Sequence, residues 1–429
     1  MRVVVIGSGI VGAGAAYHLS RRGATVTVVD GGSGHGEATR AGAGIVCPWV
    51  DHPDDDDWYR LTSQGARSYP ALVEELGEDI GYAKVGALLV AEDPADLEPV
   101  RALLLRRHAA APEMGDITDV PTPAELFPPL SDRLSAILVP GAARVDGCSV
   151  RDALLRAAVA RGAEVRKGIA TLSPDGTGVH VFPSVPAPGP GPGPDLGLGT
   201  GTGAGSEVDG SAASDEGSAA LAPEGADGSW RQAAPLAPPV SGPASPGGQF
   251  IVGEGVPIEA DKVIVAAGAW TGEVCGSLGV ELPIFPRRGQ ILHATLEGVD
   301  TAWWPIILPR IGPYLLGFPG SRVVVGATVE DVGFSSRVTM GGLEEVIEAG
   351  LRVAPGLFNA TVSETRVGLR PVYAPGQALI GPLTDRVVVA TGLSAYGLTA
   401  GPFAGEIAAA LALGETPPLD ITPYAPTLG

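Results

Sequence analysis

The strongest chemical signal in the sequence is a spaced set of glycines near the N-terminus. Gly7, Gly9 and Gly12 stand in the run GSGIVG, and Asp30 follows eighteen residues after Gly12. These glycines suit, in order, a tight turn, close approach of the backbone to a pyrophosphate, and close packing of a helix on a strand. A carboxylate at Asp30 can accept both hydroxyls of an adenosine ribose. The pattern therefore predicts a dinucleotide-binding site.

The elements that would position this turn can also be read from the sequence. Residues 2–6 are a β-branched run typical of a strand, an apolar helix is expected up to Arg22, and residues 24–29 predict a second strand. The helix N-terminus would offer unpaired N–H groups and a dipole that favours negative charge. A secretory signal is the alternative reading, but glycines and His18 interrupt the apolar run and no cleavage site follows.

Composition limits the class of protein. The chain has 429 residues, of which 45% are hydrophobic, so two or three domains are expected. No uninterrupted apolar run reaches the roughly 20 residues of a membrane span, so no transmembrane segment is expected. A formal charge of −20 argues against nucleic acid or an anionic membrane as a partner. Three scattered cysteines predict no disulfide framework and favour a reducing, cytoplasmic location.

The order of the predicted elements indicates an α/β fold with one domain interrupted by another. A helix–glycine–strand unit near residue 165, a buried strand ending near Gly268 and a glycine turn before a helix to residue 413 all return to the first sheet. The prediction is a Rossmann-type dinucleotide-binding domain (1–80, 144–182, 248–275, 365–413), an inserted α+β substrate domain on an antiparallel sheet (81–143, 276–364) and a C-terminal tail (414–429).

Residues 183–247 form an insertion rich in Gly, Pro, Ala and Ser that is predicted to be disordered, because it cannot bury enough apolar surface to offset its ordering entropy. The flanking runs 178–182 and 249–252 are expected to be two strands of a hairpin with an expanded turn. The acidic run 54–57 is interpreted as the N-terminal cap of a helix over 58–76, and no metal site is predicted.

Taken together, seven stretches resemble the D-amino acid oxidase family of FAD-dependent amine oxidoreductases, which includes D-amino acid dehydrogenases, glycine oxidases and sarcosine oxidases. In the family's order they are 7–12 with Asp30, 38–44, 263–270, 286–290, 326–330 with 333–334, 368–371, and 392–402. The resemblance covers nearly the whole chain outside the insertion. It implies FAD rather than NAD, and noncovalent FAD because residues 39–44 contain no histidine.

The resemblance also implies where the cofactor binds. It assigns the first glycine turn to the pyrophosphate, Val165 to the adenine side, and the turn at residues 397–399 to the isoalloxazine, where a helix dipole would stabilise negative charge. The predicted cofactor-binding residues are Gly7, Gly9, Ile10, Val11, Gly12, Asp30, Thr39, Arg40, Gly42, Ala43, Gly44, Val165, Ala267, Gly268, Trp270, Arg370, Gly397, Leu398 and Thr399.

Arg370 matches the arginine with which family members hold the substrate carboxylate, a role that suits a planar guanidinium. Arg310, Tyr314 and Tyr396 are further pocket candidates. The chain departs from the family pattern at two positions. Leu393 stands where relatives often have histidine, and Tyr396 stands where the residue is usually small.

The activity implied is hydride transfer from a substrate Cα to flavin N5, which gives an imine and then, by hydrolysis, a 2-oxo acid. The predicted substrate is a small amino acid, with D-amino acids preferred. A glycine or sarcosine type of oxidase, or an oxidase of another N-substituted amine, is the alternative, and a non-catalytic flavoprotein subunit of a larger complex is the second. Oxygen or a quinone-type acceptor would take the electrons, and the oligomeric state is left open.

Overall fold

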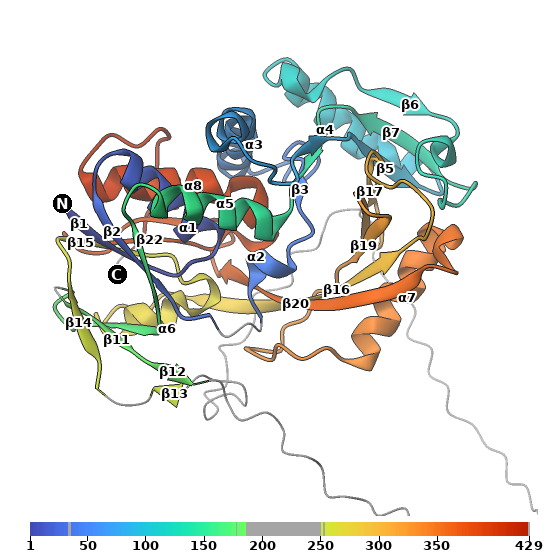
Figure 1. Cartoon of the computed structure of the whole chain (residues 1–429). Coiled ribbons are helices and arrows are strands. Elements are labelled where there is room, and N and C mark those ends of the chain that lie inside the picture. Colours follow the sequence, from blue (N-terminus) through green and yellow to red (C-terminus); the bar gives the residue numbers. More distant parts are fainter. Residues whose placement is uncertain (33–35, 177, 186–249, 252–253, 428–429) are drawn as a thin grey trace, which may run out of the picture.

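The computed structural model describes residues 1–32, 36–176, 178–185, 250–251 and 254–427. Two large sheets lie side by side, and two long strands, β16 (Ile284–Thr295) and β20 (Thr361–Tyr373), run from one region to the other (Figure 1). The predicted fold class, a Rossmann-type α/β region with a separate antiparallel sheet, is confirmed.

Six strands form the first, largely parallel sheet. They are β1 (Arg2–Ile6), β2 (Thr25–Asp30), β9 (Glu164–Lys167), β15 (Lys262–Val265), β21 (Leu379–Pro382) and β22 (Val387–Thr391). Their spatial order is β21-β22-β15-β1-β2-β9, and β21 is the antiparallel edge strand. β9 pairs in parallel with β2, so the helix–glycine–strand unit near residue 165 joins this sheet as predicted.

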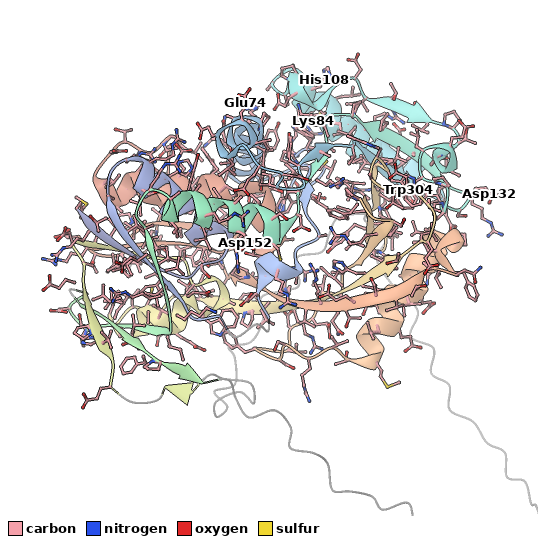
Figure 2. All side chains as sticks on the ribbon, viewed as in Figure 1. Glu74, Lys84, His108, Asp132, Asp152 and Trp304 are labelled. Atoms are coloured by element: carbon pink, nitrogen blue, oxygen red, sulfur yellow. The ribbon has the colours of Figure 1, made fainter. Side chains whose placement is uncertain are left out.

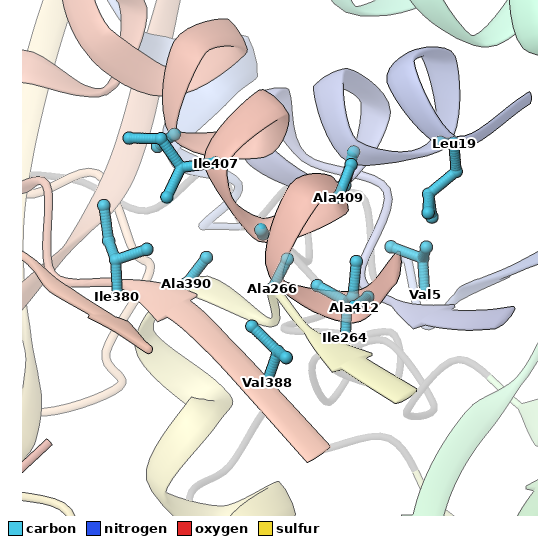
Figure 3. Packing of buried hydrophobic residues seen from close by; sticks show 14 of the residues in the cluster. Val5, Leu19, Ile264, Ala266, Ile380, Val388, Ala390, Ile407, Ala409 and Ala412 are labelled. Atoms are coloured by element: carbon cyan, nitrogen blue, oxygen red, sulfur yellow. The ribbon is translucent and has the colours of Figure 1, made fainter. Parts of the chain in front are cut away.

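The two faces of this sheet are covered differently (Figure 1). One face carries the helices α1 (Ile10–Arg21), α3 (Asp56–Leu76), α5 (Gly147–Val159) and α8 (Gly397–Leu413), and the other carries β10 (Ile169–Leu172), β11 (Gly178–Phe182), β14 (Val256–Glu259) and α6 (Thr271–Gly276). Side chains of a strand alternate between faces. Val5 therefore packs in the helix-side core with Ile407 (Figure 3), whereas Val4 packs in the core on the other face.

Eight strands form the second sheet, in the order β20-β16-β19-β18-β17-β5-β7-β6. Besides β16 and β20 these are β5 (Ala87–Ala91), β6 (Thr118–Val120), β7 (Ser135–Val139), β17 (Ile306–Pro309), β18 (Tyr314–Phe318) and β19 (Arg322–Gly326). All neighbours are antiparallel except β17 and β5. α4 (Glu98–His108) and α7 (Met340–Val353) pack on opposite faces of this sheet.

Short elements complete the described chain. Trp304, labelled in Figure 2, precedes β17 and packs on Phe127 with ring centroids 4.5 Å apart. The other elements are α2 (Ala38–Ala41), β3 (Ile45–Val46), β4 (Ala83–Lys84), β8 (Ala143–Arg144), β12 (Ser184–Val185), β13 (Phe250–Ile251) and the 3-10 helices Pro94–Leu97, Pro112–Met114, Pro123–Glu125, Gly268–Trp270, Pro355–Leu357, Ser394–Tyr396 and Thr422–Tyr424. None of the helices in these described segments is long and apolar enough to cross a membrane.

Two local predictions can be compared directly with the structure. Asp55 caps α3, since its carboxylate accepts from the backbone N–H of Trp58 at 2.9 Å, and among the described residues no group of His, Cys, Asp and Glu could hold a metal ion. The runs that flank the insertion form antiparallel pairs as predicted, but with other partners: β11 pairs with β14, and residues 250–251 pair with β12. Most of the predicted disordered insertion, from residue 186 on, lies outside the described residues.

The helices α1 and α8 pack closely because glycines face each other at their crossing. A Cβ on Gly405 would lie 2.5 Å from the backbone nitrogen of Ala15, and a Cβ on Gly14 would lie 2.9 Å from the carbonyl oxygen of Pro402. Such distances leave no room for a methyl group. The crossing therefore depends on glycine at these positions.

We expect Gly405→Ala to lower the free energy of unfolding by about 1–3 kcal/mol, because the added methyl must push two helix backbones apart. Thermal and urea unfolding measure this. Gly341→Ala is the matched control: Gly341 is also helical, but a Cβ there meets nothing within 4 Å, so stability should stay the same or rise. Equal effects of the two substitutions would contradict the packing argument.

Candidate active site

A cleft of about 3850 Å³ runs between the two sheets. The carboxyl ends of β1, β2 and β15 border it, which is where open parallel sheets bind ligands. Sixteen of the predicted cofactor-binding residues line the cleft: Gly7, Gly9, Ile10, Val11, Asp30, Thr39, Gly42, Ala43, Gly44, Ala267, Gly268, Trp270, Arg370, Gly397, Leu398 and Thr399. The candidates Arg310, Tyr314 and Tyr396 line it as well.

The N-terminus of α1 faces the cleft through the glycine turn. Gly7 has a φ of 108°, and a Cβ there would lie 2.3 Å from the carbonyl oxygen of Ala266, which directly follows β15, so only glycine fits. Gly9 is the N-cap and provides no side-chain cap. The hydroxyl of Thr39 accepts from the backbone N–H of Ile10 at 3.0 Å. Backbone donors and a helix dipole at one place form a suitable site for a phosphate.

Asp30 closes β2 beside this turn. Its Oδ1 accepts from the backbone N–H of Gly32 at 3.0 Å, and the residue borders the cleft. A carboxylate held in this way at the end of the second strand can accept hydrogen bonds from a ribose.

Three predicted cofactor-binding residues do not line the cleft. Gly12 lies under the glycine turn, where a Cβ would be 1.9 Å from the carbonyl oxygen of Gly7, so it serves helix-on-strand packing. Arg40 points to Glu364, with 3.7 Å between Nη2 and Oε1. Val165 is 42% exposed on the edge strand β9, and residues 168–171 border the cleft in its place.

The second helix N-terminus at the cleft belongs to α8. Its N-cap, Tyr396, gives no side-chain cap, and a Cβ on Gly397 or on Gly268 would meet nothing within 4 Å. The hydroxyl of Thr399 donates to the carbonyl oxygen of Ile45 at 2.9 Å. This end of the cleft therefore offers open space beside backbone N–H groups.

Arg370 projects from β20 across a glycine on β16. A Cβ on Gly289 would lie 2.4–2.6 Å from the guanidinium atoms, so the guanidinium lies directly over the glycine backbone. One nitrogen, Nη1, donates to the carbonyl oxygens of Arg288 at 3.2 Å and Thr328 at 3.1 Å. Burial raises the pKa of the neighbouring Tyr314, and its hydrogen bond and the charge of Arg370 oppose that shift.

A partly buried ion pair holds the segment that follows β19. Arg288 pairs with Glu330, and Glu330 also accepts from the Thr328 hydroxyl at 2.6 Å and the Gln290 amide at 2.8 Å. Burial alone would raise the pKa of Glu330, but these hydrogen bonds outweigh it and lower the pKa to about 2. The network ties the cleft wall at residues 329–337 to β16.

A polar cluster that sequence analysis did not find lies beside Tyr396. The Tyr396 hydroxyl donates to Oδ2 of Asp51, and both residues line the cleft. The ring of His52 lies 5.3 Å from that of Tyr396 and 5.2 Å from that of Trp58. Burial, opposed in part by Asp51 and Asp55, lowers the pKa of His52 and favours its neutral form.

Arg107, from α4, fixes the backbone that carries this cluster. Its guanidinium donates to the carbonyl oxygens of Trp49 at 2.8 Å, Asp51 at 2.7 Å and His52 at 2.7 Å, and lies 4.0 Å from the ring centre of Tyr59. No motif marks these residues, and Tyr396 is 345 positions from Asp51 in sequence. Only the folded chain brings them together.

The family follows from comparison with known proteins. The family model for FAD dependent oxidoreductases matches residues 2–191 and 238–411. The chain belongs to this family. The resemblance to D-amino acid oxidases is thus confirmed, the protein is an FAD-dependent amine oxidoreductase, and the interval between the matched ranges falls inside the insertion.

Three relatives cover nearly the whole chain. The crystal structure of iminodiacetate oxidase from a Chelativorans species is 38% identical, with a TM-score of 0.80, over 99% of both chains. An uncharacterised oxidoreductase of Bacillus subtilis is 37% identical over 99% of this chain and 98% of its own. Glycine oxidase of Bacillus licheniformis is 24% identical over 96% of this chain and 93% of its own.

The residues of the cleft fit FAD. The α1 turn offers backbone donors to a pyrophosphate, Asp30 offers a carboxylate to a ribose, and open space lies beside the N-terminus of α8. FAD, when bound, supplies the acceptor for a hydride. The protein contributes the helix dipoles and the side chains that orient what binds beside it.

We expect Glu330→Gln to destabilise the protein by roughly 2–3 kcal/mol at pH 7. A carboxylate whose pKa is lowered by folding stabilises the folded state at every pH above the ordinary pKa of the group. The difference should narrow as the pH falls from 4.5 toward 2, where the carboxylate of the folded protein becomes protonated. Denaturant unfolding between pH 7 and pH 3 measures it. Glu348→Gln, at an exposed pair with Arg352, is the control and should change stability little at any pH.

Proposed function

We propose that the protein oxidises the C–N bond of a small N-carboxymethyl amine, a secondary amine that carries an acetate arm. This is the N-substituted alternative of the sequence analysis, and it takes the place of the D-amino acid preference. The relative with 38% identity is an iminodiacetate oxidase, and a second full-length relative is a glycine oxidase. Iminodiacetate and glycine both have a Cα without a side chain.

The observation that carries the proposal is the position of Arg370. Its guanidinium lies over Gly289 and borders the cleft that also contains the N-terminus of α8. An arginine held by two backbone carbonyls keeps a fixed plane, which suits bidentate binding of a carboxylate. Binding the carboxylate there would orient the adjacent Cα–H bond toward the open space beside Gly397.

We assign the parts of FAD to the residues that line the cleft. We assign the pyrophosphate to residues 7–11, the adenosine ribose to Asp30 and the isoalloxazine to residues 397–399. Noncovalent attachment stays a prediction. Because Val165 and Arg40 lie outside the cleft, we assign the adenine side to residues 168–171.

In this reaction the side chains of the cleft orient the substrate. Arg370 holds the acetate arm, Tyr314 stays protonated beside it, and loss of the hydride from Cα leaves an imine. Water hydrolyses the imine to a 2-oxo acid and the remaining amine. Oxygen or a quinone-type acceptor would reoxidise the cofactor.

We expect anaerobic addition of iminodiacetate or sarcosine to bleach the flavin absorbance of the purified protein. D-alanine, L-alanine and glycine are the competing substrates in the same titration, and admission of air then identifies an oxidase. Acid precipitation should release the flavin if it is noncovalent. Faster reduction by D-alanine would restore the D-amino acid reading, and a flavin that no amine reduces would favour a non-catalytic subunit.

Gly289→Ala tests the position of Arg370 without removing it. The added methyl displaces a flexible side chain rather than backbone, so stability should change by less than about 1 kcal/mol. The KM for the carboxylated amine should rise by about 10- to 100-fold, the effect of losing a charged hydrogen-bonded pair. Gly341→Ala again serves as the control. An unchanged KM would remove Arg370 from the substrate site.

A further inference from the structure

Asp51 is a carboxylate at the cleft that the proposed function has not used. It is half-buried, and one of its oxygens, Oδ2, accepts from the Tyr396 hydroxyl. Within the described part of the chain, the other oxygen, Oδ1, accepts no hydrogen bond. A cleft-lining carboxylate with an available oxygen can accept a hydrogen bond or a proton from a bound ligand.

The position of Asp51 is fixed from two sides. Arg107 holds its backbone carbonyl, and Tyr396 holds its side chain. Burial, followed by the nearby charge of Asp51, raises the pKa of Tyr396 well above its ordinary range, so the hydroxyl remains a donor. Because Arg107 and Tyr396 both hold Asp51, its carboxylate has less freedom to move than a carboxylate on the surface.

Asp51 and Arg370 line the same cleft, and a short stretch of chain connects their walls. Val372, two residues after Arg370, forms a backbone bridge with Leu393, and Tyr396 follows three residues later. The turn from Leu393 to Tyr396 thus leads from the strand of Arg370 to the hydroxyl that holds Asp51. A cation and an anion stand on connected walls of one cleft, as a zwitterionic amino acid requires.

We propose that Asp51 binds the ammonium group of the substrate and takes one of its protons, while Arg370 holds the carboxylate. The inference rests on the proposed oxidation of an amino acid. In this step a substrate N–H bond breaks, an O–H bond forms at Oδ1, and nitrogen keeps the electron pair. That pair forms the C=N bond when the hydride leaves Cα, so the amine must lose its proton first.

Other charged or titratable groups surround this carboxylate. They come from its own loop, from α4 and from the turn before α8, and they are Cys47, His52, Asp55, Arg107 and Tyr396. Burial raises the pKa of Cys47 and lowers that of His52, so both are expected to be neutral near pH 7. The charges that remain near Asp51 are those of Arg107 and Asp55.

The pH dependence of kcat/KM tests the proposal, together with the anaerobic rate of flavin reduction. For the wild type, kcat/KM should be flat near neutral pH, because Asp51 accepts the proton of the ammonium form. For Asp51→Asn, kcat/KM should rise about tenfold per pH unit up to the pKa of the substrate amine, with a loss of about 100-fold at pH 7. Asp51→Glu keeps a carboxylate and should keep the flat profile at a lower rate.

Asp54→Asn is the matched control, since it removes the same charge at an exposed position three residues away, and it should leave the profile unchanged. Flavin content and thermal midpoint show that each variant is folded. A wild-type profile that already rises up to the pKa of the amine, or an Asp51→Asn profile equal to the wild type, overturns the proposal. Failure of every amine to reduce the wild-type flavin instead overturns the proposed function.

Discussion

The close approach of α1 and α8 is the constraint on which the site depends. Both helices begin at the cleft, and their N-termini can lie near each other only if the helices pack backbone to backbone. Gly14 and Gly405 provide that contact, and Gly401 accommodates Ile10 in the same interface. A larger residue at Gly14 or Gly405 would push the two helices apart, and their N-termini, the positive ends of the helix dipoles, would also move apart. One cofactor could then no longer bind at both helix ends.

The substrate end of the cleft depends on a different element, the paired strands β16 and β20. Their register places Arg370 opposite Arg287, two residues from Gly289. Gly289 is the only glycine of β16, so the side chain of Arg370 can cross over its backbone. Because the two strands extend from one sheet region to the other, their ladder fixes where Arg370 lies relative to the helix N-termini (Figure 1). The strand register thus places the charge of Arg370 at a cleft whose other wall is formed by the N-termini of α1 and α8.

The sequence predicted those features that are encoded locally. The glycine spacing of residues 7–12, the β-branched strands and the acidic cap at Asp55 each depend on neighbours within a few positions, and the fold class followed from them. Pairing and contact between distant segments could not be predicted in this way. The strand partners on the two sides of the insertion differ from the prediction, and Val165 lies on an exposed edge strand. The hydrogen bond of Tyr396 to Asp51 joins residues 345 positions apart.

Tyr396 and Asp51 form a hydrogen-bonded pair, of which only the tyrosine was expected at the cleft from the sequence. A tyrosine hydroxyl buried near the cleft needs an acceptor, and Asp51 is that acceptor. At a position where the family resemblance leads us to expect a small residue, this chain has a ring that takes up volume at the N-cap of α8. In the proposed binding mode, this ring leaves less room for a substituent on Cα, and Asp51 faces the amine. That combination suits an N-carboxymethyl amine better than a D-amino acid with a bulky side chain, because the former extends from nitrogen rather than from Cα.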